Sequence, residues 1–191
     1  MTTAPLTSPA APVGVAPLAR TVVEVAGHPF HAIWAPEDGA LRAAGFATDD
    51  DPDADSLMQR LGRLDPELAA RGVENAADDR FGIAAALRAY ADGDLAAIDA
   101  LPVFQPETPF RGEVWRALRE VPAGRAVTYT ELAALAGRPS AVRAAASGCA
   151  NNLVALVVPC HRIVRTDGGL GGYLFGTPVK EALLRHEGAI L

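Results

Sequence analysis

Hydrophobic and polar residues alternate in short runs along the first half of the chain. Three such runs, separated by the turn sequences GHP and EDG, predict the strands of antiparallel hairpins: residues 21–26, 30–34 and 41–47. Helical spacing of apolar residues then appears at 56–62 and 80–91, and residues 97–104 return to a strand-like pattern. The first half is therefore predicted to be a small α+β unit.

The pattern becomes mostly helical in the second half. From Thr108 onward, apolar residues recur on one face at helical spacing. Two further helices are expected: one begins at a capping box formed by Thr128 and Glu131, and the next opens at Pro139 and runs to about residue 148. Because a short segment containing glycine separates them, this pair predicts a helix-turn-helix.

An uninterrupted apolar run follows these helices. Residues 153–158 have the length of a buried strand, and a last helix is predicted at 177–188. Residues 1–18 form an N-terminal tail that is rich in alanine, proline and threonine. This tail is expected to be disordered, because it cannot bury enough apolar surface to offset its chain entropy. The fold class is therefore α+β, with a tail and two domains: residues 1–18, 19–104 and 105–191.

Charge is divided unevenly between the two halves of the chain. The net charge is −6, but residues 1–104 carry 16 acidic and 7 basic side chains, whereas residues 105–191 carry 7 acidic and 10 basic ones. A polyanion would therefore bind to the C-terminal half.

The sequence contains no signal for export or membrane insertion. No apolar run is long enough to span a bilayer, and residues 1–18 lack the basic start and unbroken apolar stretch of a signal peptide. We therefore expect a protein of the bacterial cytoplasm or nucleoid, with no membrane partner. The 2 cysteines fit a reducing compartment, and with 4 scattered histidines they show no ligand spacing, so no metal site is expected.

Cys160 carries the strongest chemical signal. Pro159 would end the buried strand just before it, and His161 and Arg162 supply a proton acceptor and a positive charge, which favour a thiolate. Cys149 has no such neighbours at the end of an alanine-rich helix, so a packing role is expected for it.

Two other residues invite a functional interpretation. Glu187 falls in the last turn of the final helix, where the helix dipole disfavours an acid. It could orient His161 and complete a Cys-His-Glu relay, although from the residues alone a solvated acid at a helix end is the simpler interpretation. Arg143 is the one long polar side chain among the small residues of 140–150. It could fill the space left by an extruded nucleotide, or it could lie at the rim of tightly packed helices.

Several motifs together resemble one known family. They are PF at 109–110, VW at 114–115, AVTY at 126–129, AVR at 141–143, PCHRIV at 159–164, GGY at 171–173 and KEALLRHEG at 180–188. This collinear set, which covers residues 100–188, resembles the active-site region of the methylated-DNA–protein-cysteine methyltransferases. The first half resembles that family only in its order of hairpins followed by helices.

The resemblance implies an N-terminal RNase H-like α+β domain packed on a C-terminal winged-helix-like domain with a helix-turn-helix that enters the minor groove. By position, Cys160 would accept the alkyl group, His161 would relay its proton through water, and Glu187 would orient that histidine. Asn152 would brace the active-site turn. Tyr129 would press on the phosphate backbone and help to protonate the departing guanine.

The resemblance also implies residues that bind the base and the DNA. Arg143 would fill the gap left by the flipped base, with Ala144 and Ser147 facing the DNA beside it. The side chains or backbone of four residues would line the guanine pocket: Tyr173, Lys180, Ile163 and Leu174.

The implied reaction is the irreversible transfer of an alkyl group from O6 of guanine to Cys160, with O4 of thymine as a second candidate position. No cofactor is expected, and each molecule would act once. The partner would be double-stranded DNA carrying alkylated guanine, bound by a monomer without an obligate protein partner. The alternatives are a noncatalytic lesion-binding sensor, which Cys160 argues against, and a cysteine hydrolase, for which no oxyanion motif is visible.

The chain departs from the family pattern in three places. Leu153 stands where the family usually has proline, and Ala146 and Ser147 stand where it has glycines. Phe175 stands beside the pocket where the family generally has glycine, so this bulky ring is expected to narrow the pocket and restrict the range of alkyl groups.

Overall fold

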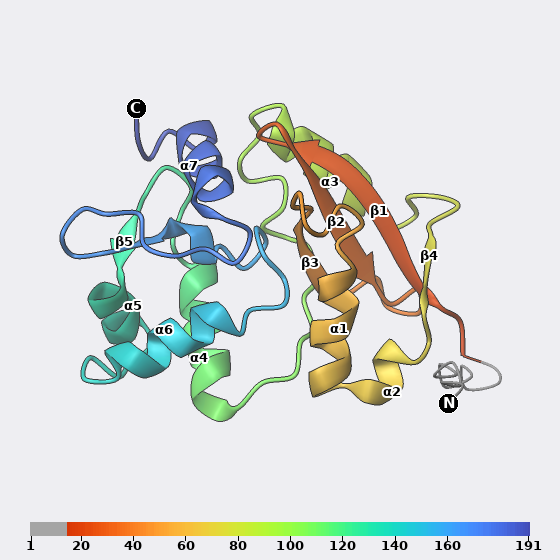
Figure 1. Ribbon diagram of the computed structural model, residues 1–191, viewed down its shortest axis with the longest axis horizontal. Coiled ribbons are helices and arrows are strands. Elements are labelled where there is room, and N and C mark those ends of the chain that lie inside the picture. The colour runs from red at the N-terminus through yellow and green to blue at the C-terminus, as the bar shows by residue number, and fades with distance from the viewer. Residues whose placement is uncertain (1–14) are drawn as a thin grey trace, which may run out of the picture.

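A four-stranded sheet forms the centre of the N-terminal half. The computed structural model describes residues 15–191, and in Figure 1 this sheet and its helices lie on one side of the molecule, with the C-terminal helices on the other. The strand order is β3-β2-β1-β4, with β1–β2 and β2–β3 antiparallel and β1–β4 parallel. The strands are β1 (Leu18–Val25), β2 (His28–Trp34), β3 (Leu41–Phe46) and β4 (Val73–Asn75).

The first hairpin turns one residue earlier than the sequence predicts, so His28 and Pro29 belong to β2 and not to the turn. Ala26 and Gly27 both have positive φ, 51° and 79°, which is the conformation of a two-residue turn whose twist matches that of the strands. Three helices follow the hairpins and pack around the sheet: α1 (Asp55–Leu64), α2 (Pro66–Ala69) and α3 (Ile83–Ala91).

Helices dominate the C-terminal half. Its elements are α4 (Pro109–Arg119), β5 (Val127–Thr128), α5 (Tyr129–Leu135), α6 (Val142–Ala150), the 3-10 helix η1 (Cys160–Arg162), β6 (Ile163–Val164) and α7 (Thr177–His186). The capping box is confirmed, because the side chains of Thr128 and Glu131 each bond to the backbone of the other residue. Pro109 occupies the first turn of α4, as expected.

The two halves share one hydrophobic core. The strand β3 connects them directly, because Ala44 accepts a hydrogen bond from Ala155 N (2.9 Å) and donates one to Leu153 O (2.7 Å). A single parallel bridge pairs Ala44 with Val154 at the same place. The segment that leads to Cys160 therefore rests on the edge of the N-terminal sheet.

Three sequence predictions are wrong in detail. Residues 97–104 form turns and not a strand, and residues 153–158 are buried but also turn, with Leu156 at a φ of 69°. Each segment makes only one isolated bridge to β3. Its apolar composition therefore reflects burial and not the repeated hydrogen bonding of a strand. Pro139 lies outside any helix, and α6 begins at Val142.

The described residues also bear on the expected tail and on membrane association. Residues 1–14 of the predicted tail lie outside the described residues, and Leu18, assigned to that tail, is the fully buried first residue of β1. Between residues 15 and 191, no helix has the length and apolar character needed to cross a membrane.

Candidate active site

Cys160 lies at the wall of a cavity of about 300 Å³. It is the first residue of η1, directly after Pro159, and is partly buried. The other residues that line the cavity come from α5, α6, the turn after α6 and the 172–175 loop and include Tyr129, Ala146, Cys149, Asn152, Tyr173, Leu174 and Phe175. The cavity therefore brings the candidate nucleophile together with two of the predicted pocket residues, Tyr173 and Leu174, and with Tyr129, the predicted proton donor to guanine.

Asn152 holds the thiol in place. Its Nδ2 donates to Sγ of Cys160 (3.4 Å) and to the carbonyl oxygen of Val158 (2.8 Å). Its Oδ1 accepts hydrogen bonds from Val154 N (3.1 Å) and from Nε2 of Gln105 (3.2 Å). Because the amide is buried and all its bonds point in fixed directions, it fixes the turn that carries the cysteine.

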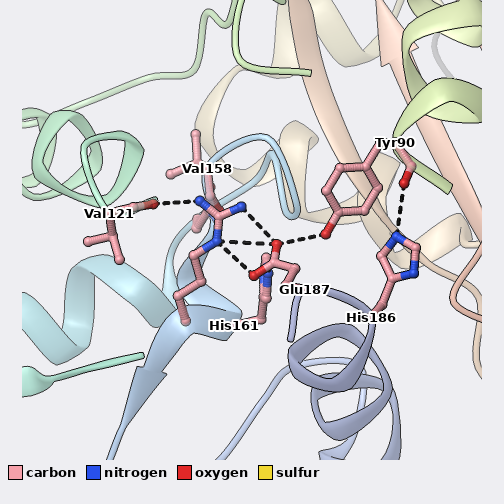
Figure 2. A network of polar contacts seen from close by, with 8 residues as sticks. Tyr90, Val121, Val158, His161, His186 and Glu187 are labelled. Atoms are coloured by element: carbon pink, nitrogen blue, oxygen red, sulfur yellow. Dashed lines mark hydrogen bonds and ion pairs between the residues drawn. The ribbon is translucent and has the colours of Figure 1, made fainter. Parts of the chain in front are cut away.

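A buried polar network surrounds Glu187 (Figure 2). Nε2 of His161 lies 3.0 Å from Oε1 of Glu187, and both side chains have 0% of their surface exposed. Tyr90 of α3 donates its hydroxyl to the same oxygen at 2.7 Å. Glu187 is thus a buried partner of His161 and not a solvated acid at a helix end.

Arg162 completes the charge balance of this network. Its Nη2 lies 2.7 Å from Oε1 of Glu187, its Nε lies 3.0 Å from Oε2, and its Nη1 donates to the carbonyl oxygen of Val121 at 2.5 Å. A charge buried without partners would be costly, but this carboxylate receives bonds from three side chains. The network fixes the orientation of the His161 ring.

The pKa values of these groups follow from burial and from their partners. Burial alone would raise the pKa of Glu187, but the hydrogen bonds from His161 and Arg162 and the charge of Arg162 outweigh it and hold that pKa below its ordinary value. Burial lowers the pKa of His161, so its imidazole is neutral at neutral pH. Burial raises the pKa of the Cys160 thiol, and the Asn152 hydrogen bond and the charges of Lys180 and Arg60 oppose this rise.

Two predicted pocket residues lie behind the cavity wall. Lys180 is fully buried, and its Nζ donates to the carbonyl oxygens of Ile163 and Leu170. Ile163 is also fully buried, in β6. Neither side chain lines the cavity, so in this structure Lys180 braces the segment between β6 and the 172–175 loop.

The predicted DNA-facing residues share one side of α6. Arg143, Ala144 and Ser147 are all exposed, whereas Ala145 and Gly148 of the same helix are buried. Gly148 permits close packing, because a Cβ there would lie 2.8 Å from a methyl carbon of Val114. One face of α6 is therefore packed on α4, and the face with the lone arginine is open.

Sequence reasoning missed several members of the site. Tyr90 and Gln105 bond to Glu187 and Asn152 across 97 and 47 positions, and no local pattern marks such distant partners. Cys149 was expected only to pack, but it lines the same cavity as Cys160, and burial raises the pKa of its thiol well above the ordinary value. Within the described residues, no group of three or more His, Cys, Asp or Glu side chains is placed to hold a metal ion.

Comparisons with known proteins agree with this geometry. Residues 109–189 match the family model described as the DNA-binding domain of 6-O-methylguanine DNA methyltransferase. A methylated-DNA–protein-cysteine methyltransferase of Shigella flexneri is 42% identical over 129 residues, which are 67% of this chain and 75% of that protein. One from Salmonella typhimurium is 46% identical over 110 residues, 58% of this chain and 64% of that protein.

A solved structure extends the likeness to the N-terminal half. The crystal structure of Mycobacterium tuberculosis OGT in complex with DNA matches with a TM-score of 0.66 and covers 90% of this chain and 93% of that one. The sequence identity is 24%, so this match shows the shared α+β fold alone. The sequence relatives carry the assignment: this chain belongs to the methylated-DNA–protein-cysteine methyltransferase family.

Proposed function

We propose that the protein repairs DNA by transferring an alkyl group from O6 of guanine to its own Cys160, once per molecule. The observation that carries the proposal is the placement of a thiol at a cavity wall, held by Asn152 and followed in the chain by His161, whose buried partner is Glu187. A thiolate is a strong nucleophile towards carbon, and the resulting thioether is stable. Because the thioether bond is stable, each molecule is consumed by one transfer.

The first chemical step is the removal of the thiol proton. Nδ1 of His161 is buried and makes no hydrogen bond to the described residues, so it can accept the proton of Cys160 through a water molecule. Glu187 accepts a hydrogen bond from Nε2, the other ring nitrogen of His161, and stabilises the imidazolium that forms. The depressed pKa of His161 means that the imidazole is ready to accept a proton at neutral pH.

The second step is the displacement. The sulfur of Cys160 forms a bond to the alkyl carbon while the bond between that carbon and O6 breaks, and the electron pair leaves with guanine. Tyr129 lines the cavity and, because burial raises the pKa of its hydroxyl, keeps its proton at neutral pH and can give it to the leaving base. Tyr129 then regains a proton from the imidazolium of His161 through solvent, so the net proton movement is from the thiol to guanine.

Binding of the base follows from the cavity and from α6. Tyr173 has a buried hydroxyl without a partner among the described residues and can bond to the base, while the backbone of Leu174, which lines the cavity, supplies a further contact. A guanine reaches such a cavity only when it leaves the base stack, and Arg143 would take its place in the duplex. Ala144 and Ser147 would let α6 approach the groove closely.

The architecture that supports this function is an N-terminal RNase H-like domain of residues 19–104 and a C-terminal winged-helix-like domain of residues 105–191. The partner is double-stranded DNA containing the lesion, and the protein acts as a monomer in the bacterial cytoplasm or nucleoid. The family model for the matched segment is a DNA-binding domain, which supports the assignment of DNA contacts to the C-terminal half.

A sensor that binds the lesion without repairing it is the alternative, and one experiment separates the two. The protein is incubated with duplex DNA containing O6-methylguanine, and the mass of the intact protein is measured. A gain of one methyl group supports repair, and Cys160→Ser should remove that gain while leaving DNA binding intact. Binding of the methylated duplex with no change in the mass of the wild-type protein would refute the proposal in favour of the sensor.

A further inference from the structure

One side chain of the N-terminal half reaches the turn that carries the active site. Arg60 lies on α1, and its Nη2 donates to the carbonyl oxygens of Ala150 (3.0 Å) and Asn152 (3.1 Å). These contacts span 90 and 92 positions of the chain. They join the helix α1 to the segment between α6 and Cys160.

The position of this arginine is fixed by its helix. Leu57 and Leu61 are fully buried, and they anchor α1 in the core on either side of position 60. A side chain on such an anchored helix holds its partners more firmly than one on a loop. The guanidinium of Arg60 is partly buried, and its Nη1 is enclosed without a hydrogen-bond partner among the described residues.

Each carbonyl that Arg60 binds matters for the proposed reaction. Ala150 is the last residue of α6, where the helix dipole places partial negative charge and the carbonyl has no partner in the helix, so a cation is favourable there. Asn152 is the residue whose side chain donates to Sγ of Cys160. Arg60 therefore holds the backbone of the residue that holds the thiol.

The charge of Arg60 also acts on the thiol. The charged and titratable groups that face Cys160 come from five parts of the fold: Arg60 of α1, Tyr129 of α5, Cys149 of α6, Tyr173 of the 172–175 loop and Lys180 of α7. Only two of these are cations. Burial raises the pKa of Cys160, and Arg60 and Lys180 counteract this effect by favouring the thiolate.

We propose that Arg60 is a positioning residue of the transfer reaction, through which the N-terminal half holds the active-site turn and stabilises the thiolate of Cys160. This inference rests on the proposed function for its link to repair, but the reactivity of the thiol can be measured without DNA. The N-terminal half is then part of the chemical site, and not only a support for the DNA-binding half.

The test compares variants at position 60 in a Cys149→Ser background, where Cys160 is the sole thiol. Arg60→Met removes both the charge and the donors, Arg60→Gln keeps a donor without the charge, and Arg60→Lys keeps the charge. Arg63→Met is the matched control, since Arg63 is an exposed arginine of the same helix. Alkylation of the thiol by iodoacetamide is followed across the neutral and alkaline pH range, together with methyl transfer from O6-methylguanine in DNA.

Arg60→Met and Arg60→Gln should move the midpoint of the alkylation profile upward by about one pH unit, so that the thiol reacts about tenfold more slowly at neutral pH. Arg60→Lys should restore most of that reactivity, and Arg63→Met should match the unaltered background. Methyl transfer should slow in parallel with alkylation. Far-ultraviolet circular dichroism reports whether each variant is folded, and the comparison of Arg60→Lys with Arg60→Gln remains decisive if Arg60→Met does not fold.

Identical alkylation profiles for Arg60→Gln, Arg60→Lys and the unaltered protein would overturn the inference. A loss of transfer in Arg60→Gln without any shift of the profile would also overturn it, since the charge would then have no part. If the unaltered protein did not accept a methyl group from DNA, the proposed function would fail, but the alkylation profile would still decide the role of Arg60 at the thiol.

Discussion

The contact between Gly45 and Phe175 joins the N-terminal sheet to the wall of the candidate active site. Gly45 is buried in β3, and a Cβ placed there would lie 2.3 Å from Cζ of Phe175 and 3.0 Å from a methyl carbon of Leu57. The Phe175 ring is 7% exposed and also packs edge-on against Phe46 and Tyr173, with ring centroids 5.8 Å and 5.4 Å away. The glycine therefore provides the space that this ring occupies.

Gly45→Ala tests this dependence. A methyl group forced against a packed ring costs about 1–3 kcal/mol, while the loss of glycine's conformational freedom in a strand returns about 0.5–1 kcal/mol. The free energy of unfolding should therefore fall by about 1–2 kcal/mol, which lowers the Tm by roughly 2–8 °C in a chain of this size. Removing the ring instead, by Phe175→Ala, should cost about 3–5 kcal/mol because it leaves a cavity.

A double-mutant cycle measured by urea unfolding isolates the contact. In the Phe175→Ala background the added methyl group no longer meets the ring, so Gly45→Ala should be neutral or slightly stabilising, giving a coupling energy of about 1–3 kcal/mol. The cycle also has a functional readout. Gly45→Ala should push the ring towards the cavity and lower the ratio of benzyl to methyl transfer, whereas Phe175→Ala should raise it.

Two results would refute this reasoning. One is an equal loss of stability from Gly45→Ala with and without the ring, which would place the strain elsewhere in β3. The other is an unchanged ratio of benzyl to methyl transfer in both single variants, which would remove the steric role of Phe175.

Three further predictions concern the buried network and the DNA-binding face. Glu187→Gln should lower the free energy of unfolding by about 3–5 kcal/mol in urea unfolding, because it leaves the buried Arg162 charge unpaired; a change below about 1 kcal/mol would contradict the importance of that pair. Acid should destabilise the protein, because the folded state holds the pKa values of both His161 and Glu187 below their ordinary values and so binds fewer protons than the unfolded chain. The urea concentration at the unfolding midpoint should therefore drop as the pH falls below about 6.5. A midpoint that stays constant with pH would contradict these pKa shifts. Affinity for duplex DNA should fall with increasing salt, and Arg143→Ala should weaken it without changing the reactivity of the thiol. An affinity that changed neither with salt nor with Arg143→Ala would show that α6 is not the DNA-binding face.

Local patterns predicted those parts of the fold that local forces decide. The hairpins of β1 to β3 follow from the alternation of apolar and polar residues and from the glycines between the strands, and α5 begins where Thr128 and Glu131 form their capping box. The apolar run 153–158 predicts a strand, because burial and strand formation both select apolar residues. The structure shows that this run makes only one isolated bridge to β3.

The site divides in the same way between what is local and what is distant. Cys160 and His161 are adjacent in the motif at 159–164, and the motif at 180–188 identified Glu187 through the family that it resembles. Tyr90 and Arg60 had no such mark, since each reaches the site from another part of the fold through hydrogen bonds that span 90 to 97 positions. Such contacts depend on how the two halves pack, which hydrophobic periodicity does not encode.

The central claim is that Cys160 accepts one alkyl group and is consumed. The most direct measurement adds a known amount of protein to excess duplex containing O6-methylguanine and follows the repaired guanine to its plateau, then locates the methyl group in the protein. Trypsin leaves both cysteines on the peptide between Arg143 and Arg162, so this peptide must be sequenced by fragmentation. We predict a plateau near one repaired guanine per protein molecule and a methyl group on Cys160, whereas continued turnover, or a methyl group on Cys149, would contradict the account.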